Sequence, residues 1–311
     1  MDISIIIPFA KWNNNADKCV KKCLKLNYKD FEIILLPDFK FNKKFNKKIR
    51  VIETGKVKPS VKRNIGVKEA KGSIIAFIDD DAYPKKDWVN KALKYLKKDE
   101  VGIVGGPNLT PRDSSLLEKA SGDIFSSFLG AGGFALRYSA KKFKEVNELP
   151  SCNLFVKKEL FNKTKGFDTS LLTAEDAKLC FQIKKLGKKV IYAPDVVVYH
   201  HRRRLFYPHL RQVFIYGRDK AFLIKEDFSL NKLFYFFPAL LVLGLIIGGI
   251  LSFFNFYLKC IYLLVIFIYL ILDLISSLSV NLKRSPLVFI GTLLTHISYG
   301  IGFIWGMLRK K

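Results

Sequence analysis

A sharp change in composition near residue 232 constrains this chain more than any other feature. After Lys232 the sequence contains a single acid, Asp273. Three long apolar runs follow, over 234–254, 256–278 and 287–308. Each run is long enough to cross a hydrocarbon core of about 30 Å, and three in succession leave no polar face for a soluble domain. We therefore expect a membrane domain over 233–311, built from about three apolar helices. Asp273, inside a span, is expected to be functional or to pair with a residue such as His296.

Residues 1–200 have the opposite character, because short apolar runs alternate with helical patterns. The clearest run, Ile74–Ile78, leads directly into three acids. Such alternation predicts an α/β domain with a mainly parallel sheet, and a continuous apolar strand is buried on both faces. The acids then emerge at the carboxyl end of the strand, where open α/β sheets bind ligands. We expect a mobile loop or short helices near this site over Ser114–Tyr138, a stretch rich in Gly, Ser and Phe.

The net charge of +26 is typical of proteins that bind nucleic acid. The lysines are scattered, however, and none of the nucleic-acid-binding signatures is present, so a basic surface facing anionic lipid explains the charge better. Residues 201–232 form a basic amphipathic juxtamembrane segment of the kind that suits an interfacial helix. Its arginines either hold an acceptor phosphate or contact lipid headgroups alone.

The basic residues also predict an orientation. The positive-inside rule places the domain before the first span on the cytoplasmic side of a cell membrane, in a multi-pass protein. Lys283 and Arg284 agree with that placement. The tail Arg309–Lys311 does not agree, because three full crossings would put it outside. Either the last segment is interfacial or re-entrant, or the tail breaks the rule.

The triplet Asp79, Asp80 and Asp81 needs a neutralising charge, because adjacent carboxylates repel each other. A Mg²⁺ or Mn²⁺ ion would supply it, since these ions bind through carboxylates and substrate phosphates. A solvated turn is the alternative. A second acidic pair, Glu175 and Asp176, begins a predicted helix. It is either a helix-start preference or, in a shared cleft, the base that takes a proton from an attacking hydroxyl.

The order of motifs resembles that of family 2 glycosyltransferases, which have the GT-A nucleotide-sugar fold. The matching stretches are Ser4–Pro8, Asp38, Lys62-Arg63-Asn64 with Gly66, Phe77–Asp81, Ser151–Asn153, Gly166–Asp168, Glu175-Asp176 and Tyr199-His200. Together they cover about the first 200 residues. The resemblance implies a GT-A catalytic domain over 1–200, followed by C-terminal transmembrane helices.

The resemblance also implies roles for individual residues. Five would bind the donor, a nucleoside-diphosphate sugar: Pro8, Asp38, Arg63, Asp79 and Asp80. Asp38 would contact the nucleobase, and Asp79 or Asp80 the ribose or diphosphate.

The metal would be held by Asp81 and His200, with His201 as the competing histidine. Asp176 would be the catalytic base, paired with Glu175. Four further residues would contact the acceptor or the diphosphate: Asn153, Arg202, Arg203 and Arg211.

The sequence departs from the family in two places. Lys11, Trp12 and Asn13–Asn15 replace the acid often found after the first strand, which leaves the base preference open. Gln212 is followed by Val213, so the Gln-x-x-Arg-Trp motif of processive synthases is missing, and transfer of a single sugar is favoured.

The chain resembles non-processive, membrane-bound members that extend lipid-linked oligosaccharides or exopolysaccharide units. We therefore expect an inverting, metal-dependent hexosyltransferase that acts on a hydroxyl of a lipid-linked saccharide. A polyprenyl-phosphate sugar synthase, whose acceptor is a lipid phosphate, is one alternative. A non-catalytic membrane scaffold with a nucleotide-sugar fold is the other.

Overall fold

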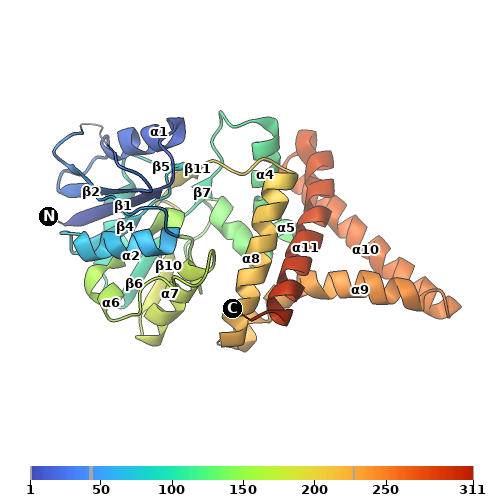
Figure 1. Ribbon diagram of the computed structural model, residues 1–311. Helices are drawn as coiled ribbons and strands as arrows, with labels where there is room; N and C mark the ends of the chain where they lie inside the picture. Colours follow the sequence, from blue (N-terminus) through green and yellow to red (C-terminus); the bar gives the residue numbers. More distant parts are fainter. Residues whose placement is uncertain (1, 42–44, 227, 311) are drawn as a thin grey trace. The chain divides into compact units, whose positions relative to one another are not determined.

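The computed structural model describes residues 2–41, 45–226 and 228–310. Its internal contacts divide the chain into two compact units. The first comprises Met1–Pro111 and Leu136–His201, and the second comprises Arg112–Ala135 and Arg202–Lys311. All strands among the described residues lie in the first unit, and the second is helical (Figure 1).

The first unit is built on an eight-stranded sheet of order β3-β2-β1-β4-β9-β6-β10-β8. Its strands are β1 (Ile3–Phe9), β2 (Phe31–Pro37), β3 (Ile49–Val51), β4 (Ile74–Phe77), β6 (Val101–Gly105), β8 (Lys144–Glu145), β9 (Leu154–Lys157) and β10 (Lys189–Tyr192). The pairs β1–β2, β1–β4, β2–β3 and β6–β10 are parallel. Strand β9 is antiparallel to β4 and β6, and β8 is antiparallel to β10. The prediction of a mainly parallel sheet is confirmed.

Helices cover both faces of this sheet. They are α1 (Asn14–Cys23), α2 (Pro59–Glu69), α3 (Trp88–Leu96), α6 (Lys158–Asn162) and α7 (Glu175–Lys185), with the short 3-10 helix η2 (Ser151–Asn153). Because successive side chains of a strand point to opposite faces, Ile5 of β1 joins a core with α1 and α3, and Ile6 joins a second core with α2, α6 and α7. The apolar strands are therefore buried on both faces.

A second, three-stranded sheet of order β5-β11-β7 extends the first unit. Its strands are β5 (Ala82–Pro84), β7 (Asn108–Leu109) and β11 (Val198–His200). Strand β11 is antiparallel to β5, with His200 opposite Ala82. This register places Ala82, which directly follows the acid triplet, beside His200, which comes at the end of the first unit in the sequence.

The second unit contains the long apolar helices. Its helical elements are α4 (Leu116–Ser126), α5 (Phe128–Ala131), η1 (Gly132–Tyr138, which ends in the first unit), α8 (Tyr207–Glu226), η3 (Leu230–Phe236), α9 (Phe237–Leu251), α10 (Phe256–Val280), η4 (Leu282–Arg284) and α11 (Ser285–Leu308). Three segments, 232–251, 256–280 and 282–308, are long and apolar enough to cross a membrane. The three apolar helices expected from the sequence are present.

The segment 114–138 forms short helices, which is one of the two alternatives expected for it. It contains α4, α5 and η1, and polar contacts join α4 to η4 and α8. Asp123 accepts a hydrogen bond from Arg284 at 2.5 Å, and Ser121 contacts His209 Nδ1 at 2.7 Å. A stretch rich in glycine and serine is thus ordered by long-range contacts that its composition does not reveal.

Of the two alternatives for Asp273, the one that pairs it with His296 is not found in the structure. Asp273 is fully buried in the second unit, where its carboxylate accepts a hydrogen bond from Ser277 at 3.4 Å. His296 has other partners for both ring nitrogens, the hydroxyl of Tyr269 at 2.9 Å and the carbonyl of Leu129 at 2.9 Å.

Candidate active site

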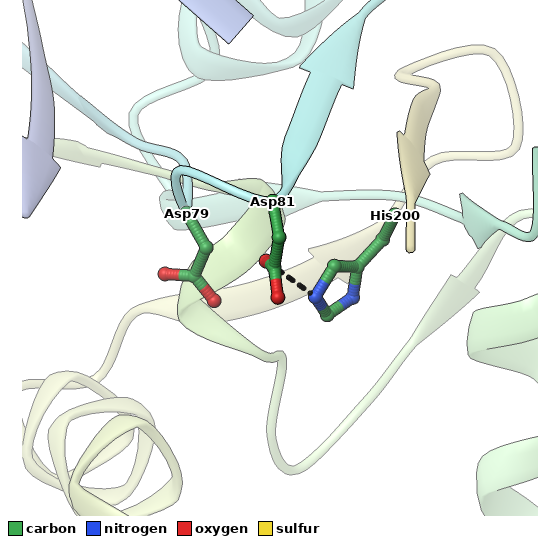
Figure 2. A group of neighbouring side chains, drawn as sticks. All are labelled: Asp79, Asp81 and His200. Carbon is green, nitrogen blue, oxygen red and sulfur yellow. Dashed lines mark ion pairs between the residues drawn. The ribbon is translucent and has the colours of Figure 1, made fainter. Parts of the chain in front are cut away.

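The acid triplet lies in the turn between β4 and β5, and two of its carboxylates converge with His200. Asp79, Asp81 and His200 each offer a ligand atom, and these atoms all lie within 4.8 Å of one another. Figure 2 shows the three side chains, with His200 Nε2 at 3.0 Å from Asp81 Oδ1. A backbone bond from His201 to the carbonyl of Asp81 fixes the two segments together. Two carboxylates and an imidazole are ligands that suit a divalent cation such as Mn²⁺.

The charge on His200 depends on its neighbours. Burial disfavours the protonated ring, but the Asp81 carboxylate and the Cys152 thiol outweigh burial and raise the pKa of His200 to about 10. Without a cation, His200 is therefore an imidazolium that partly neutralises the acids. A cation that binds through this ring would take the place of the proton.

A buried guanidinium joins the triplet to the second acidic pair. Arg63, on α2, donates through Nη2 to Asp79 Oδ1 at 2.7 Å and through Nη1 to Glu175 Oε1 at 2.8 Å. The Arg63 side chain is only 5% exposed. Burial and then the adjacent charge of Asp176 raise the pKa of Glu175 to about 7, against the lowering effect of Arg63. One side chain thus couples two acidic groups that are far apart in the sequence.

Asp176 is held by backbone donors at the start of α7. Its Oδ2 accepts from the Ser151 amide at 3.1 Å, and its Oδ1 accepts from the Ala177 amide at 2.7 Å. Ala174, immediately before the helix, adopts a left-handed conformation with φ of 64°, which is unfavourable for a residue with a side chain. The two backbone hydrogen bonds thus fix the half-buried Asp176 carboxylate beside Glu175.

Lys62 is a site residue to which the sequence assigned no role. Its ammonium donates to the carbonyls of Phe9 at 2.6 Å and Leu36 at 3.0 Å, and it forms an ion pair with Asp38. It thereby ties together the carboxyl ends of β1 and β2. The sequence does contain a signal for this placement, because Lys62 precedes Gly66 by four residues and residues at this spacing lie on the same face of a helix. Gly66 packs against Ile6 and Leu36 of the sheet. Lys62 therefore also lies on the face of α2 toward the sheet.

Two other donor-binding candidates lie near these elements. Pro8 is buried in β1, opposite Leu36 of β2. Asp80 is half-buried in the turn between Asp79 and Asp81. The structure thus brings every donor-binding and metal-binding candidate to the carboxyl ends of β1, β2 and β4 or to the adjacent small sheet.

Four residues are candidates for contact with the acceptor or the diphosphate, and of these Asn153 belongs to the first unit. Asn153 is fully buried, and its amide bonds the Trp88 indole at 2.8 Å and the carbonyls of Pro107 and Val196 at 3.1 and 2.7 Å. Both its N–H groups are thus used within the protein, so we leave it out of the proposed acceptor contacts.

The three arginines among these candidates belong to the second unit. Arg202 is buried, with 8% of its surface exposed, whereas Arg203 and Arg211 are exposed. Only the exposed pair presents a surface to a ligand.

Comparison with known proteins gives distant relatives with consistent names. The chain is 25% identical over 167 residues to a pre-mycofactocin glycosyltransferase of Mycobacterium tuberculosis, covering 52% of this chain and 34% of the relative. It is 21% identical over 220 residues to the glycosyltransferase AglE of Haloferax volcanii, covering 65% of this chain and 67% of AglE. The chain thus spans about a third of the length of the mycobacterial relative.

A solved structure shares the fold. The mannosyltransferase PcManGT from Pyrobaculum calidifontis, in complex with GDP-Man and Mn²⁺, superposes with a TM-score of 0.60 at 16% identity, covering 97% of this chain and 87% of that chain. The family model of glycosyl transferase family 2 matches residues 4–164, just over half of the chain. With the GT-A-like fold and the acid triplet at the carboxyl end of β4, the chain belongs to glycosyl transferase family 2.

Proposed function

We propose that this enzyme transfers a single sugar from a nucleoside-diphosphate sugar to a hydroxyl of a lipid-linked saccharide, with inversion of the anomeric configuration. One observation carries the proposal. The Asp79, Asp81 and His200 group is joined through Arg63 to the acidic pair Glu175 and Asp176. A donor-activating group and a base therefore belong to one connected site.

The donor half would hold the nucleotide and a divalent cation. Asp79, Asp81 and His200 fit Mn²⁺ or Mg²⁺ by their donor atoms, and PcManGT was solved with GDP-Man and Mn²⁺. A bound ion would neutralise the charge that develops on the departing diphosphate. Asp38, at the end of β2, would contact the nucleobase, and Pro8, at the end of β1, would also belong to the donor site.

The acceptor half would supply a base. Asp176 takes the proton of the acceptor hydroxyl while that oxygen attacks the anomeric carbon and the bond to the nucleoside diphosphate breaks. Its two backbone donors fix the direction of the carboxylate. A single displacement of this kind inverts the configuration. Arg63 holds Glu175 in place beside Asp176. We assign the proton transfer to Asp176 and not to Glu175.

The membrane unit supports a lipid-linked acceptor. Helices in 233–311 are apolar enough to enter a bilayer, and the basic segment 201–232 presents exposed arginines such as Arg203 and Arg211. These would attract an anionic headgroup or the diphosphate of the acceptor. We place the catalytic domain, 1–200, on the cytoplasmic side, where nucleotide sugars and the basic surface would meet.

The variant Asp176→Asn tests the assignment of the base. Transfer should fall by at least a hundredfold, on the scale of general-base contributions, while UDP or GDP binding is retained. Asp195→Asn is the matched control, because that carboxylate bonds Tyr95 at 2.9 Å and pairs with Lys91 instead of a site residue. Full activity of Asp176→Asn would contradict the assignment. It would point to a phosphate acceptor, which is ionised without a base.

A further inference from the structure

Helices α8 and α11 lie side by side and run in the same direction (Figure 1). Near the start of α8, His209 Nε2 contacts Thr295 Oγ1 at 2.9 Å. Near its end, Lys225 Nζ donates to the carbonyl of Arg309 at 2.7 Å. Residue numbers therefore increase together along both helices, and the contact extends over nearly all of α8.

Three glycines bring the two backbones close together. A Cβ atom on Gly217 would lie 2.2 Å from the carbonyl oxygen of Tyr299, and one on Gly302 would lie 2.1 Å from that of Phe214. On Gly306 it would lie 2.5 Å from the carbonyl oxygen of Arg218. Helices packed this closely along their length must lie at the same depth in a membrane.

The connection between the two helices restricts which segments can cross. Helix α9 begins soon after α8 ends, and α10 ends shortly before α11 begins. If both α9 and α10 cross, the end of α8 and the start of α11 lie on one side of the bilayer. Parallel packing also places the N-terminal half of α11 at the same end of the helix pair as the start of α8, because Thr295 contacts His209. Both conditions hold only if neither α8 nor α11 crosses.

The alternative would have α8 and α11 cross together with only one of α9 and α10. Helix α8 argues against it, because Arg211, Arg218, Asp219 and Lys220 would enter the hydrocarbon core. Helix α9 contains no charged residue, and α10 contains only Lys259, in its first turn, and the buried Asp273.

We propose that α9 and α10 cross the bilayer as a hairpin, and that α8 and α11 lie together at the membrane surface on the side of the catalytic domain. Helix α8 begins six residues after His201, so the chain keeps it on that side. The exposed apolar residues of α11, Ile290, Ile301 and Trp305, then face lipid.

This arrangement reconciles the charges with the positive-inside rule. Lys283, Arg284, Arg309 and Lys310 all fall on the side of the catalytic domain. The hairpin tip, residues 252–258, has no charged side chain, and its exposed Phe253 and Phe254 suit the opposite interface. Apolar length alone allows three crossings, but packing and charge together favour two.

Cysteine labelling of the full-length protein in sealed vesicles tests the topology. A Cys260→Ser background removes the exposed native thiol, and the other four cysteines are buried. Single cysteines then replace Lys142, Phe254 or Lys310, all of which are exposed. A membrane-impermeant maleimide is added before and after permeabilisation, and Lys142→Cys marks the side of the catalytic domain.

Lys310→Cys should be labelled from the same side as Lys142→Cys, and Phe254→Cys from the opposite side only. Labelling of Lys310→Cys from the side opposite Lys142→Cys would overturn the proposal, as would labelling of Phe254→Cys from the same side. Leu308→Cys, which is also exposed, repeats the test at the tail if Lys310→Cys fails to insert.

Discussion

Replacing Arg63 with Met removes the charge that joins the two acidic groups. Two charge-assisted hydrogen bonds are lost, to Asp79 and to Glu175. Each is worth about 1.5–3 kcal/mol, and breaking a buried pair from one side costs about 3–5 kcal/mol. We expect Arg63→Met to lower the free energy of unfolding by about 3 kcal/mol, because protonation of Glu175 relieves part of the cost of an unpaired buried charge. This corresponds to a fall in melting temperature of roughly 6–12 °C for a domain of this size.

The loss of stability caused by Arg63→Met should depend on pH. The pKa of Glu175, about 7, already lies above its ordinary value of 4.5, so the folded state binds more protons than the unfolded state between these values. Stability therefore falls as pH rises through this window. Without Arg63 the carboxyl would ionise only at still higher pH. The variant should thus lose more stability, relative to the wild type, at pH 8 than at pH 6.

Arg50→Met is a matched control for this experiment. Arg50 also bridges two acids, Glu32 at 3.0 Å and Glu69 at 3.6 Å, but its side chain is 32% exposed. Its loss should cost about 1 kcal/mol. Thermal unfolding of the full chain in detergent at both pH values measures the difference. The double variant Arg63→Met/Glu175→Gln should recover the pH-dependent part of the loss, whereas the bond to Asp79 stays lost. Equal shifts for the two arginine variants, or no pH dependence, would refute the reasoning.

Two further predictions concern packing. Gly302→Val should disrupt the contact with α8 and lower the melting temperature, because its Cβ would meet the carbonyl of Phe214. Gly244→Val should leave the melting temperature unchanged, because no atom lies within 4 Å of a Cβ at that position. Equal melting temperatures of the two variants would contradict the close packing. Asn153→Leu should lower the melting temperature by leaving its buried partners unpaired, at about 1–3 kcal/mol per group. The folded fraction of Asn153→Leu should keep the KM of the wild type for the acceptor. A rise in the KM for the acceptor without a change in the KM for the donor would restore Asn153 as an acceptor contact.

The sequence revealed features that depend on local patterns. An apolar run that ends just before Asp79 indicates a buried strand followed by an acidic turn, and the structure has both. Apolar length likewise revealed the three long helices. These predictions succeed because strand burial and span length are set by consecutive residues.

Features that depend on long-range contacts were not visible in the sequence. Arg63 joins Asp79 and Glu175, which are 16 and 112 positions away, and no local pattern specifies that pairing. The burial of Asn153 and the internal hydrogen bonds of its amide could likewise not be read from composition. Packing of α8 on α11 is equally non-local, so apolar length alone could not reveal it.

Nucleotide binding with and without Mn²⁺ tests the metal-dependent donor site most directly. UDP and GDP are titrated against the wild type, Asp81→Asn and the control Asp195→Asn. The site predicts that Mn²⁺ raises the affinity for at least one nucleotide tenfold or more, about 1.4 kcal/mol, in the wild type and the control but not in Asp81→Asn. Equal affinity with and without Mn²⁺ in the wild type, or an undiminished Mn²⁺ effect in Asp81→Asn, would contradict it.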